Sequence, residues 1–242
     1  DETKILKEVD LDIAPRQIVG ITGKSGCGKS TMAKLIQGLY RPQSGLVGLD
    51  NIDLRLLDLS HIRSQVSLVS AESYFFPGTI RENISRPMPN SSMDRITWAT
   101  KKVFAHEEIE SFPDAYETFL EENASNISTG LRQKFAIARA LIRNPRILIL
   151  DDAMSGFDVD SEIKLYDGLP DIALGRTVII VSNRLYHLRL CNKIFVLDNG
   201  KISQQGSFEN LKNEPGFFGE TYNKQTSILG GSPINKILKK AV

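Results

Sequence analysis

A glycine-rich stretch near the start of the chain has the residue types and spacing to bind phosphate. It reads GKSGCGKS over residues 23–30 and matches the pattern G-x-x-x-x-G-K-S. Glycines let backbone N–H groups turn toward phosphate oxygens, and the positive end of a following helix attracts the same charge. Lys29 would bring its ammonium group to the outer phosphates, and Ser30 would offer a hydroxyl to Mg²⁺. The predicted phosphate contacts are Gly23, Lys24, Ser25, Gly26, Cys27, Gly28, Lys29, Ser30 and Thr31.

Two adjacent aspartates follow an apolar run later in the chain, where residues 147–158 read ILILDDAMSGFD. Asp151 is expected at the end of a buried strand, where a carboxylate binds Mg²⁺ directly or through water. The structural alternative is an aspartate that caps a turn. Asp152 stands where a nucleotide hydrolase usually carries a glutamate that activates water. Aspartate is one methylene shorter, so its oxygens stop about an ångström short, an error that can cost roughly a hundredfold in rate. Asp152 is therefore predicted to be a weak base or a spectator.

The elements that must position these residues alternate between strands and helices. The strand candidates are residues 4–13, 17–22, 66–69, 146–150, 177–181 and 193–197. The middle of the chain, residues 80–142, has fewer strand signals and more helix. A helix is predicted to begin near Ser128 and to bury one face, whose residues are Leu131, Phe135, Ala138 and Ile142. This order predicts an α/β protein with a mainly parallel sheet.

Composition narrows the class of protein. The 242 residues are 41% hydrophobic and 24% charged, with a net charge of +1, so no global field favours nucleic acid as a partner. Cys27 and Cys191 form no disulfide framework, which suits a reducing compartment. Cys27 could be a thiolate that the surrounding amides stabilise. The alternative is that it is a small residue that fills the loop. No signal peptide and no apolar run of about 20 residues occurs, which predicts a soluble segment. Because the sequence starts at Asp1 without Met, we expect it to be part of a longer protein.

The order of the motifs resembles the nucleotide-binding domain of ABC transporters, particularly the exporter type. After the phosphate loop and the helical middle, the chain reads ISTGLRQKFAIARALIRNPRILILDDAMSGFD. The resemblance implies a P-loop NTPase core over residues 1–225, with an N-terminal antiparallel β region and a helical subdomain at about 80–142. Residues 226–242 would form a C-terminal tail. A GTPase is disfavoured because Asn192-Lys193 is not followed by the guanine-reading aspartate, and a small-molecule kinase would lack residues 127–141.

The resemblance also implies a head-to-tail dimer that holds ATP and Mg²⁺ between two chains. In the family, the phosphate loop of one chain faces the signature Leu-Ser-Gly-Gly-Gln of the other. Here the signature reads Ile-Ser-Thr-Gly-Leu over residues 127–131, so Ser128, Thr129 and Gly130 would contact nucleotide in trans. The alternative is a plain helix cap. Ser30 and Asp151 would bind the metal, and Asp158 in SGFD would face the partner chain.

At three positions the residue differs from the one that the family uses for ATP hydrolysis. Ala71 replaces a glutamine that reports on the metal, and its methyl group can neither coordinate nor hydrogen-bond. Asn183 replaces the switch histidine, and an amide cannot carry a proton at neutral pH. Asp152 replaces the base. Either these changes are chance scatter, or they mark a degenerate site that binds Mg-ATP and hydrolyses it slowly or not at all. The adenine-stacking aromatic of the family has no counterpart in residues 1–20.

Two functions remain open at this stage. The first is a fully active transport ATPase with Asp152 as base. The second is a regulatory ATP-binding subunit that pairs with a second nucleotide-binding domain, more readily in a heterodimer, and with a transmembrane domain. Either one implies the cytoplasmic face of a membrane. The motifs most resemble those of exporters that carry peptides, proteins, lipids or drugs. The sequence does not indicate which of these cargoes is transported.

Overall fold

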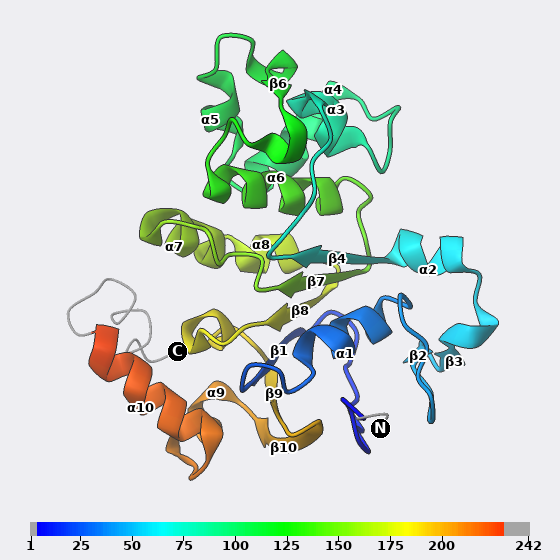
Figure 1. Cartoon of the computed structure of the whole chain (residues 1–242), viewed down its shortest axis with the longest axis vertical. Helices are drawn as coiled ribbons and strands as arrows, with labels where there is room; N and C mark the ends of the chain where they lie inside the picture. Colours follow the sequence, from blue (N-terminus) through cyan, green and yellow to red (C-terminus); the bar gives the residue numbers. More distant parts are fainter. Residues whose placement is uncertain (1–3, 230–242) are drawn as a thin grey trace.

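A computed structural model describes residues 4–229, and its centre is a six-stranded sheet. The strand order is β10-β9-β1-β8-β7-β4, and every neighbouring pair is parallel except β9 with β10 (Figure 1). The strands are β1 (Ile18–Gly23), β4 (Val66–Ser70), β7 (Ile147–Asp151), β8 (Thr177–Val181), β9 (Lys193–Asp198) and β10 (Lys201–Gly206). The predicted α/β class with a mainly parallel sheet is confirmed.

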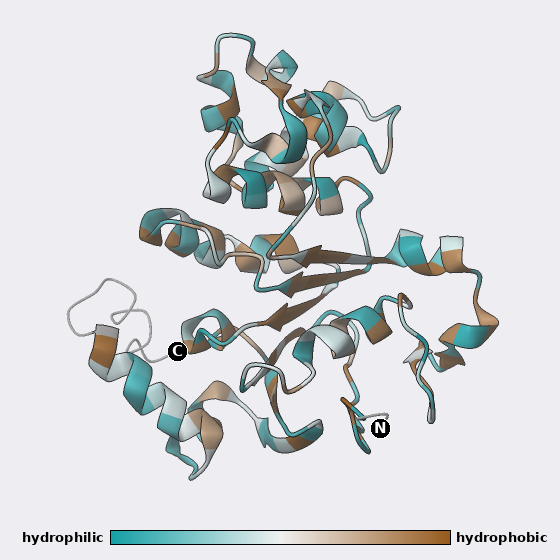
Figure 2. Cartoon of the chain, viewed as in Figure 1, coloured by the Kyte–Doolittle hydropathy of each residue, from teal (hydrophilic) through white to brown (hydrophobic). Residues whose placement is uncertain are grey.

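The strands contribute alternate residues to two cores, one on each face of the sheet. In β7, Leu148 and Leu150 belong to the larger core, whereas Ile149 belongs to the smaller one. Helix α1 (Lys29–Ile36) covers the smaller core with Met32 and Ala33. Because both faces are covered, β7 and β8 are apolar nearly throughout, and Figure 2 shows them in brown.

A lobe rich in helices lies beyond the edge strand β4. It contains α3 (Ile80–Ser85), α4 (Met93–Lys102), α5 (His106–Glu110) and α6 (Thr129–Leu141), with a short antiparallel pair of β5 (Gly78–Thr79) and β6 (Phe119–Leu120). Figure 1 shows this lobe at the top, with α6 lying closest to the sheet. Helix α6 packs against β4, and its predicted face of four residues is buried. The helical subdomain is therefore present where the sequence predicts it.

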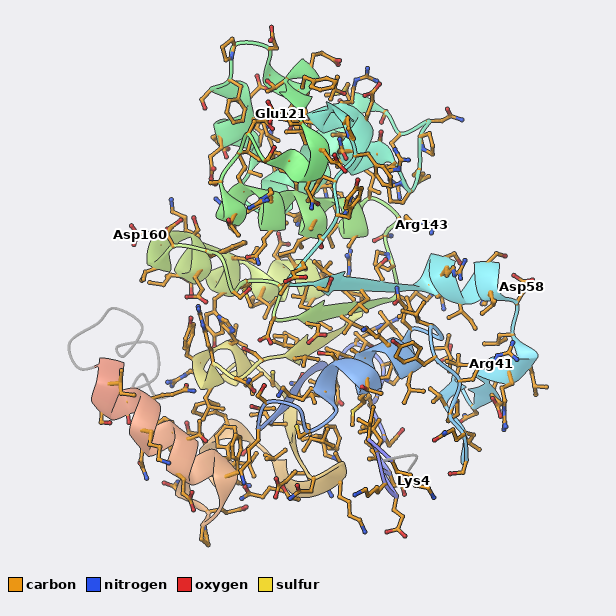
Figure 3. All side chains as sticks on the ribbon, viewed as in Figure 1. Lys4, Arg41, Asp58, Glu121, Arg143 and Asp160 are labelled. Carbon is orange, nitrogen blue, oxygen red and sulfur yellow. The ribbon has the colours of Figure 1, made fainter. Side chains whose placement is uncertain are left out.

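The remaining elements lie around the sheet. They are β2 (Gly48–Leu49), β3 (Ile52–Asp53), α2 (Leu59–Gln65), α7 (Val159–Asp167), α8 (Leu169–Ala173), α9 (Phe208–Asn213) and α10 (Phe217–Leu229), with 3-10 turns η1 (Leu54–Leu56), η2 (Ala115–Glu117), η3 (Glu122–Ala124) and η4 (Leu185–Leu188). The six charged side chains labelled in Figure 3 are all exposed on the outside. Over residues 4–229, no helix is both long enough and apolar enough to cross a membrane.

The predicted strand at residues 4–13 is wrong. This segment alternates in polarity because it lays Leu6, Val9 and Leu11 against the smaller core, but the described residues show it in no sheet. Its backbone meets the sheet region at one hydrogen bond, from Lys7 N to Gly200 O (2.8 Å). The small antiparallel strand pair in the N-terminal half of the chain is instead formed by β2 and β3. Helix α10 runs across the predicted boundary at residue 225, and the rest of the tail lies outside the described residues.

Candidate functional site

The glycine-rich loop links the end of β1 to the start of α1, as its sequence predicts. Gly23 and Gly28 have φ angles of 147° and 108°, which side chains disfavour. A Cβ atom at Gly23 would lie 2.0 Å from the carbonyl oxygen of Leu197, and one at Gly28 would lie 2.7 Å from Leu6. Glycine is therefore required at Gly23 by conformation and by space, and at Gly28 by conformation, because the tip of the Leu6 side chain can move aside. The loop can wrap tightly because these two residues carry no side chain.

Lys29 is the first residue of α1, and its ammonium group lies inside the loop. Its side chain is buried, and Nζ donates to the carbonyl oxygens of Gly23 and Lys24 at 2.9 Å each. Gly28 caps α1 without a side-chain hydrogen bond, so the amides of the first turn face the loop. Cys27 is buried, with Sγ 4.0 Å from Lys29 Nζ, and packs with the smaller core as a loop-filling residue. The loop thus combines a cation with helix-start amides, which suits a phosphate anion.

Asp151 ends β7 directly opposite the loop. Its carboxylate is buried, and burial raises its pKa, while a hydrogen bond from Ser30 and the charge of Lys29 act in the opposite direction. A hydroxyl and a carboxylate oxygen side by side are hard donors that suit Mg²⁺. Within residues 4–229, no cluster of three or more His, Cys, Asp or Glu could hold a metal by itself. A metal here would therefore bind Ser30, Asp151 and oxygens of the nucleotide.

Strand register brings the three departing positions to one edge of the sheet. Ser70, Asp151 and Val181 pair in register across β4, β7 and β8. Ala71 and Asp152 each follow directly after this row, and Asn183 follows two residues later. Parallel strands end at the same edge, and β1 ends there too, at the phosphate loop. The sequence places these residues on separate segments, and the fold gathers them around the loop.

A backbone hydrogen bond to β8 fixes the position of Asp152. The amide of Asp152 donates to the carbonyl of Val181 at 2.9 Å. Its φ is 48°, a left-handed conformation in which aspartate and asparagine are more common than longer side chains. The side chain is half-buried at the strand end. Asn183 is exposed at the same edge.

The segment that carries Asn183 is anchored by a buried polar chain. Ser182 Oγ lies 2.9 Å from His187 Nδ1, and His187 Nε2 lies 2.7 Å from Glu162 Oε1. Arg184 donates to Glu162 at 2.7 Å. Burial opposes ionisation of Glu162, but hydrogen bonds from His187 and Tyr186 and the nearby charges bring its pKa below the ordinary value. The carboxylate therefore stays charged and holds both ends of the segment.

Ser128 begins α6 as a helix cap, and this start is exposed. Its hydroxyl accepts from the amide of Leu131 at 3.2 Å, so the predicted cap is present. A Cβ at Gly130 would lie 3.3 Å from the carbonyl of Gly156, which shows that α6 approaches the loop after β7 closely. Ser128 and Thr129 are exposed. An exposed helix start can meet an anion from a second chain, so contact in trans stays a prediction.

Gln133 links α6 to two loops of the sheet edge, a role that sequence reasoning missed. Its side chain donates to the carbonyl of Ala71 (3.3 Å) and to Ser155 Oγ (3.1 Å), and it accepts from the amide of Gly156 (2.8 Å). Gln133 is two residues from Leu131 and so does not lie on the helix face predicted to be buried, and no sequence pattern indicated this role. Asp158 caps α7 by accepting from the amide of Ser161 at 2.9 Å, and its contact with a partner stays a prediction.

A parallel sheet with a glycine-rich loop, a buried lysine and a strand-end aspartate defines a P-loop nucleotide-binding domain. The family described as ABC transporter matches residues 6–155, which is more than half of the chain. The chain belongs to the ABC transporter family. It corresponds to the ATP-binding domain of that family, which implies that it binds ATP.

The relatives include exporter proteins from several sources. The cyclolysin secretion/processing ATP-binding protein CyaB of Bordetella pertussis is 41% identical over 211 residues, which cover 87% of this chain and 30% of CyaB. The alpha-hemolysin translocation ATP-binding protein HlyB of Escherichia coli is 40% identical over 215 residues, which cover 89% and 30% of the two chains. A solved structure of a bacterial Atm1-family ABC exporter with ATP bound superposes with a TM-score of 0.89 at 31% identity, covering 93% of this chain and 40% of that one. The chain therefore spans about 30% of the length of these curated relatives.

Proposed function

We propose that the chain is the ATP-binding domain of an exporter-type transporter and that it binds Mg-ATP but hydrolyses it slowly or not at all. The observation that carries the proposal is the register across β4, β7 and β8. It gathers Ala71, Asp152 and Asn183 beside an intact phosphate loop. All three replacements affect groups that the family uses for hydrolysis, whereas the phosphate loop keeps every residue of its motif, so relaxed selection on hydrolysis alone would account for the pattern.

The residues of this chain that would bind the phosphates and Mg²⁺ are intact. The loop from Gly23 to Thr31 would hold the phosphates through its amides and Lys29. Ser30 and Asp151 would hold Mg²⁺, which neutralises phosphate charge when bound. The residues that would activate water are the altered ones, because Asp152 is short and Asn183 cannot exchange a proton at neutral pH. Binding and hydrolysis are thereby separated within one site.

We infer that the domain works as one half of an unequal pair. Ser128 and Gly130, which the family uses in trans, are retained on an exposed helix start. They would complete the site on a partner whose own catalytic positions are intact. Two copies of this chain would instead place every replacement in both sites. The pair would act with a transmembrane domain at the cytoplasmic face of a membrane, as the relatives named for secretion and translocation suggest.

Binding and turnover measured on one purified sample test the proposal. Calorimetry with Mg-ATP is expected to show saturable binding, and phosphate release is expected far below the ~10 per second of a median enzyme. Lys29→Ala should abolish binding, because it removes the charge inside the loop. The matched control is Lys101→Ala, on an exposed face of α4 away from the loop, and it should bind like the original chain.

Two outcomes would count against the proposal in different ways. Turnover near the median enzyme rate would favour the alternative, an active transport ATPase with Asp152 as base. Retained affinity in Lys29→Ala would contradict the assignment of the phosphate loop itself.

A further inference from the structure

A line of buried, hydrogen-bonded polar side chains holds the inner side of the segment from Ser182 to His187. Ser182, His187 and Glu162 are 1%, 2% and 1% exposed. A serine, a histidine and a carboxylate in line could suggest a nucleophile, but no substrate can reach a hydroxyl buried to this degree. The chain is therefore structural. It fixes the two ends of the segment and leaves Asn183 and Arg184 exposed between them.

A glutamine from the C-terminal helix holds the exposed middle of this segment. Gln225 Nε2 donates to the carbonyl oxygen of Asn183 at 2.7 Å, and Gln225 Oε1 accepts from the amide of Leu185 at 3.0 Å. These two peptide groups flank Arg184. One side-chain amide thus satisfies a backbone acceptor and a backbone donor, as a neighbouring strand would. The contact joins residues about 40 positions apart in the sequence.

Helix α10 is docked firmly enough to give this contact a fixed geometry. Phe218 is fully buried, and the ring centroids of Phe208 and Phe218 lie 5.4 Å apart in an edge-to-face arrangement. Tyr222 also meets Phe208 edge to face, at 5.9 Å. Phe218, Tyr222 and Gln225 are spaced by four and three residues, so they share one helix face. Helix α10 packs on η4, the turn that contains Leu185, and Figure 1 shows it beside the yellow turn that follows β8.

We propose that Gln225 is a positioning residue that sets where Asn183 meets the terminal phosphate of ATP. The inference rests on the proposed function, because it assumes that residue 183 faces that phosphate. Gln225 holds the peptide carbonyl of Asn183 itself, whereas the buried chain holds only the residues on either side. Response to the terminal phosphate therefore depends on a residue of the C-terminal helix. ADP lacks that phosphate, so its binding does not depend on Gln225.

The test compares ATP with ADP in variants of the full chain. Gln225→Leu keeps a similar volume and removes both hydrogen bonds. It is expected to weaken Mg-ATP binding about threefold to tenfold, the range for one or two modest hydrogen bonds, and to leave Mg-ADP binding within about twofold. Gln225→Glu places a carboxylate oxygen where Nε2 donates to the carbonyl of Asn183, and because two acceptors repel, its loss of ATP affinity should be at least as large as that of Gln225→Leu. Lys224→Ala, on the exposed side of the same helix, is the control and should change neither affinity.

Hydrogen exchange of the Leu185 amide gives a second readout that needs no nucleotide. Exchange in the ligand-free chain should become faster in Gln225→Leu and stay unchanged in Lys224→Ala. Equal losses of ATP and ADP affinity, or an unchanged ATP-to-ADP ratio in Gln225→Leu, would overturn the positioning role while leaving ATP binding intact. Failure of the unaltered chain to bind either nucleotide would instead overturn the proposed function.

Discussion

Under the proposed function, individual side chains separate nucleotide binding from hydrolysis at this site. Lys29 and Asp151 are buried and held by neighbouring groups, so the binding half of the site has a defined geometry before any ligand arrives. Asp152 is held only through its backbone, in a left-handed conformation with φ of 48°. That conformation suits aspartate at least as well as glutamate. Once hydrolysis is not required, local backbone preference gives no reason to restore the longer side chain.

Restoring both altered polar positions should raise turnover. The double variant Asp152→Glu with Asn183→His returns a carboxylate of full length and a side chain that can exchange a proton. We expect phosphate release to rise by about one to two orders of magnitude, within the range that a positioned general base contributes. The measurement is steady-state phosphate release at saturating Mg-ATP.

Each single variant should gain less than the pair, because the two groups would act on the same water. Adding Lys29→Ala to the double variant is the control, and it should remove the gain by removing binding. No gain in the double variant would place the defect elsewhere, at Ala71 or in the signature at Leu131.

At the scale of elements, the sequence predicts the buried strands well and the contacts between distant segments poorly. The strand predictions at 66–69 and 177–181 agree with β4 and β8 within one residue, because strands buried on both faces are short apolar runs. The alternation in 4–13 shows that one side is buried but does not say against what, so it misleads. Glu162 and Gln225 carry no local pattern that announces a partner. Only the fold brings them to the segment after β8.

The buried chain at Glu162 should make stability depend on acid pH. Hydrogen bonds from His187 and Tyr186 and the charge of Arg184 outweigh burial and lower the pKa of Glu162 below 4.5. A carboxylate with a lowered folded pKa contributes stability that is complete above the unfolded pKa. That contribution is lost as pH falls through the folded pKa. We therefore expect Glu162→Gln to lower the free energy of unfolding at pH 7 by about 1–3 kcal/mol.

The difference between the two proteins should shrink as pH falls below about 4.5. Urea unfolding at several pH values measures it, and subtracting one chain from the other cancels the carboxylates that they share. Asp160→Asn, an exposed neighbour on α7, is the matched control and should show little difference at any pH. A difference that is constant from pH 7 to pH 3 would show that Glu162 contributes through packing rather than through charge.

At the scale of the whole molecule, the phosphate loop and the start of α6 lie in different parts of the chain. The phosphate loop, Asp151 and residues 182–187 lie at the strand ends, whereas the exposed start of α6 lies in the helical lobe (Figure 1). Gln133 connects the lobe to the loops after β4 and β7 by hydrogen bonds to Ala71 and Gly156. A second domain that supplied its own helix start would enclose the phosphates. We therefore expect association with a second domain to depend on the nucleotide.

Although the proposed pair is unequal, each copy of this chain carries both a phosphate loop and the exposed helix start at Ser128, so Mg-ATP should promote pairing of two copies, and Mg-ADP should not. Sedimentation velocity of the purified chain is expected to show a dimer fraction that rises with Mg-ATP and protein concentration. Because slow hydrolysis would preserve the ATP, the dimer should persist over hours. Ser128→Arg should abolish the dimer by placing a bulky cation at the exposed helix start, while binding of Mg-ATP to the same chain's own loop persists. Ser111→Arg, at the exposed end of α5, is the matched control and should dimerise normally. A dimer that forms equally with ADP, or survives Ser128→Arg, would show that the chains associate through a surface other than the nucleotide site.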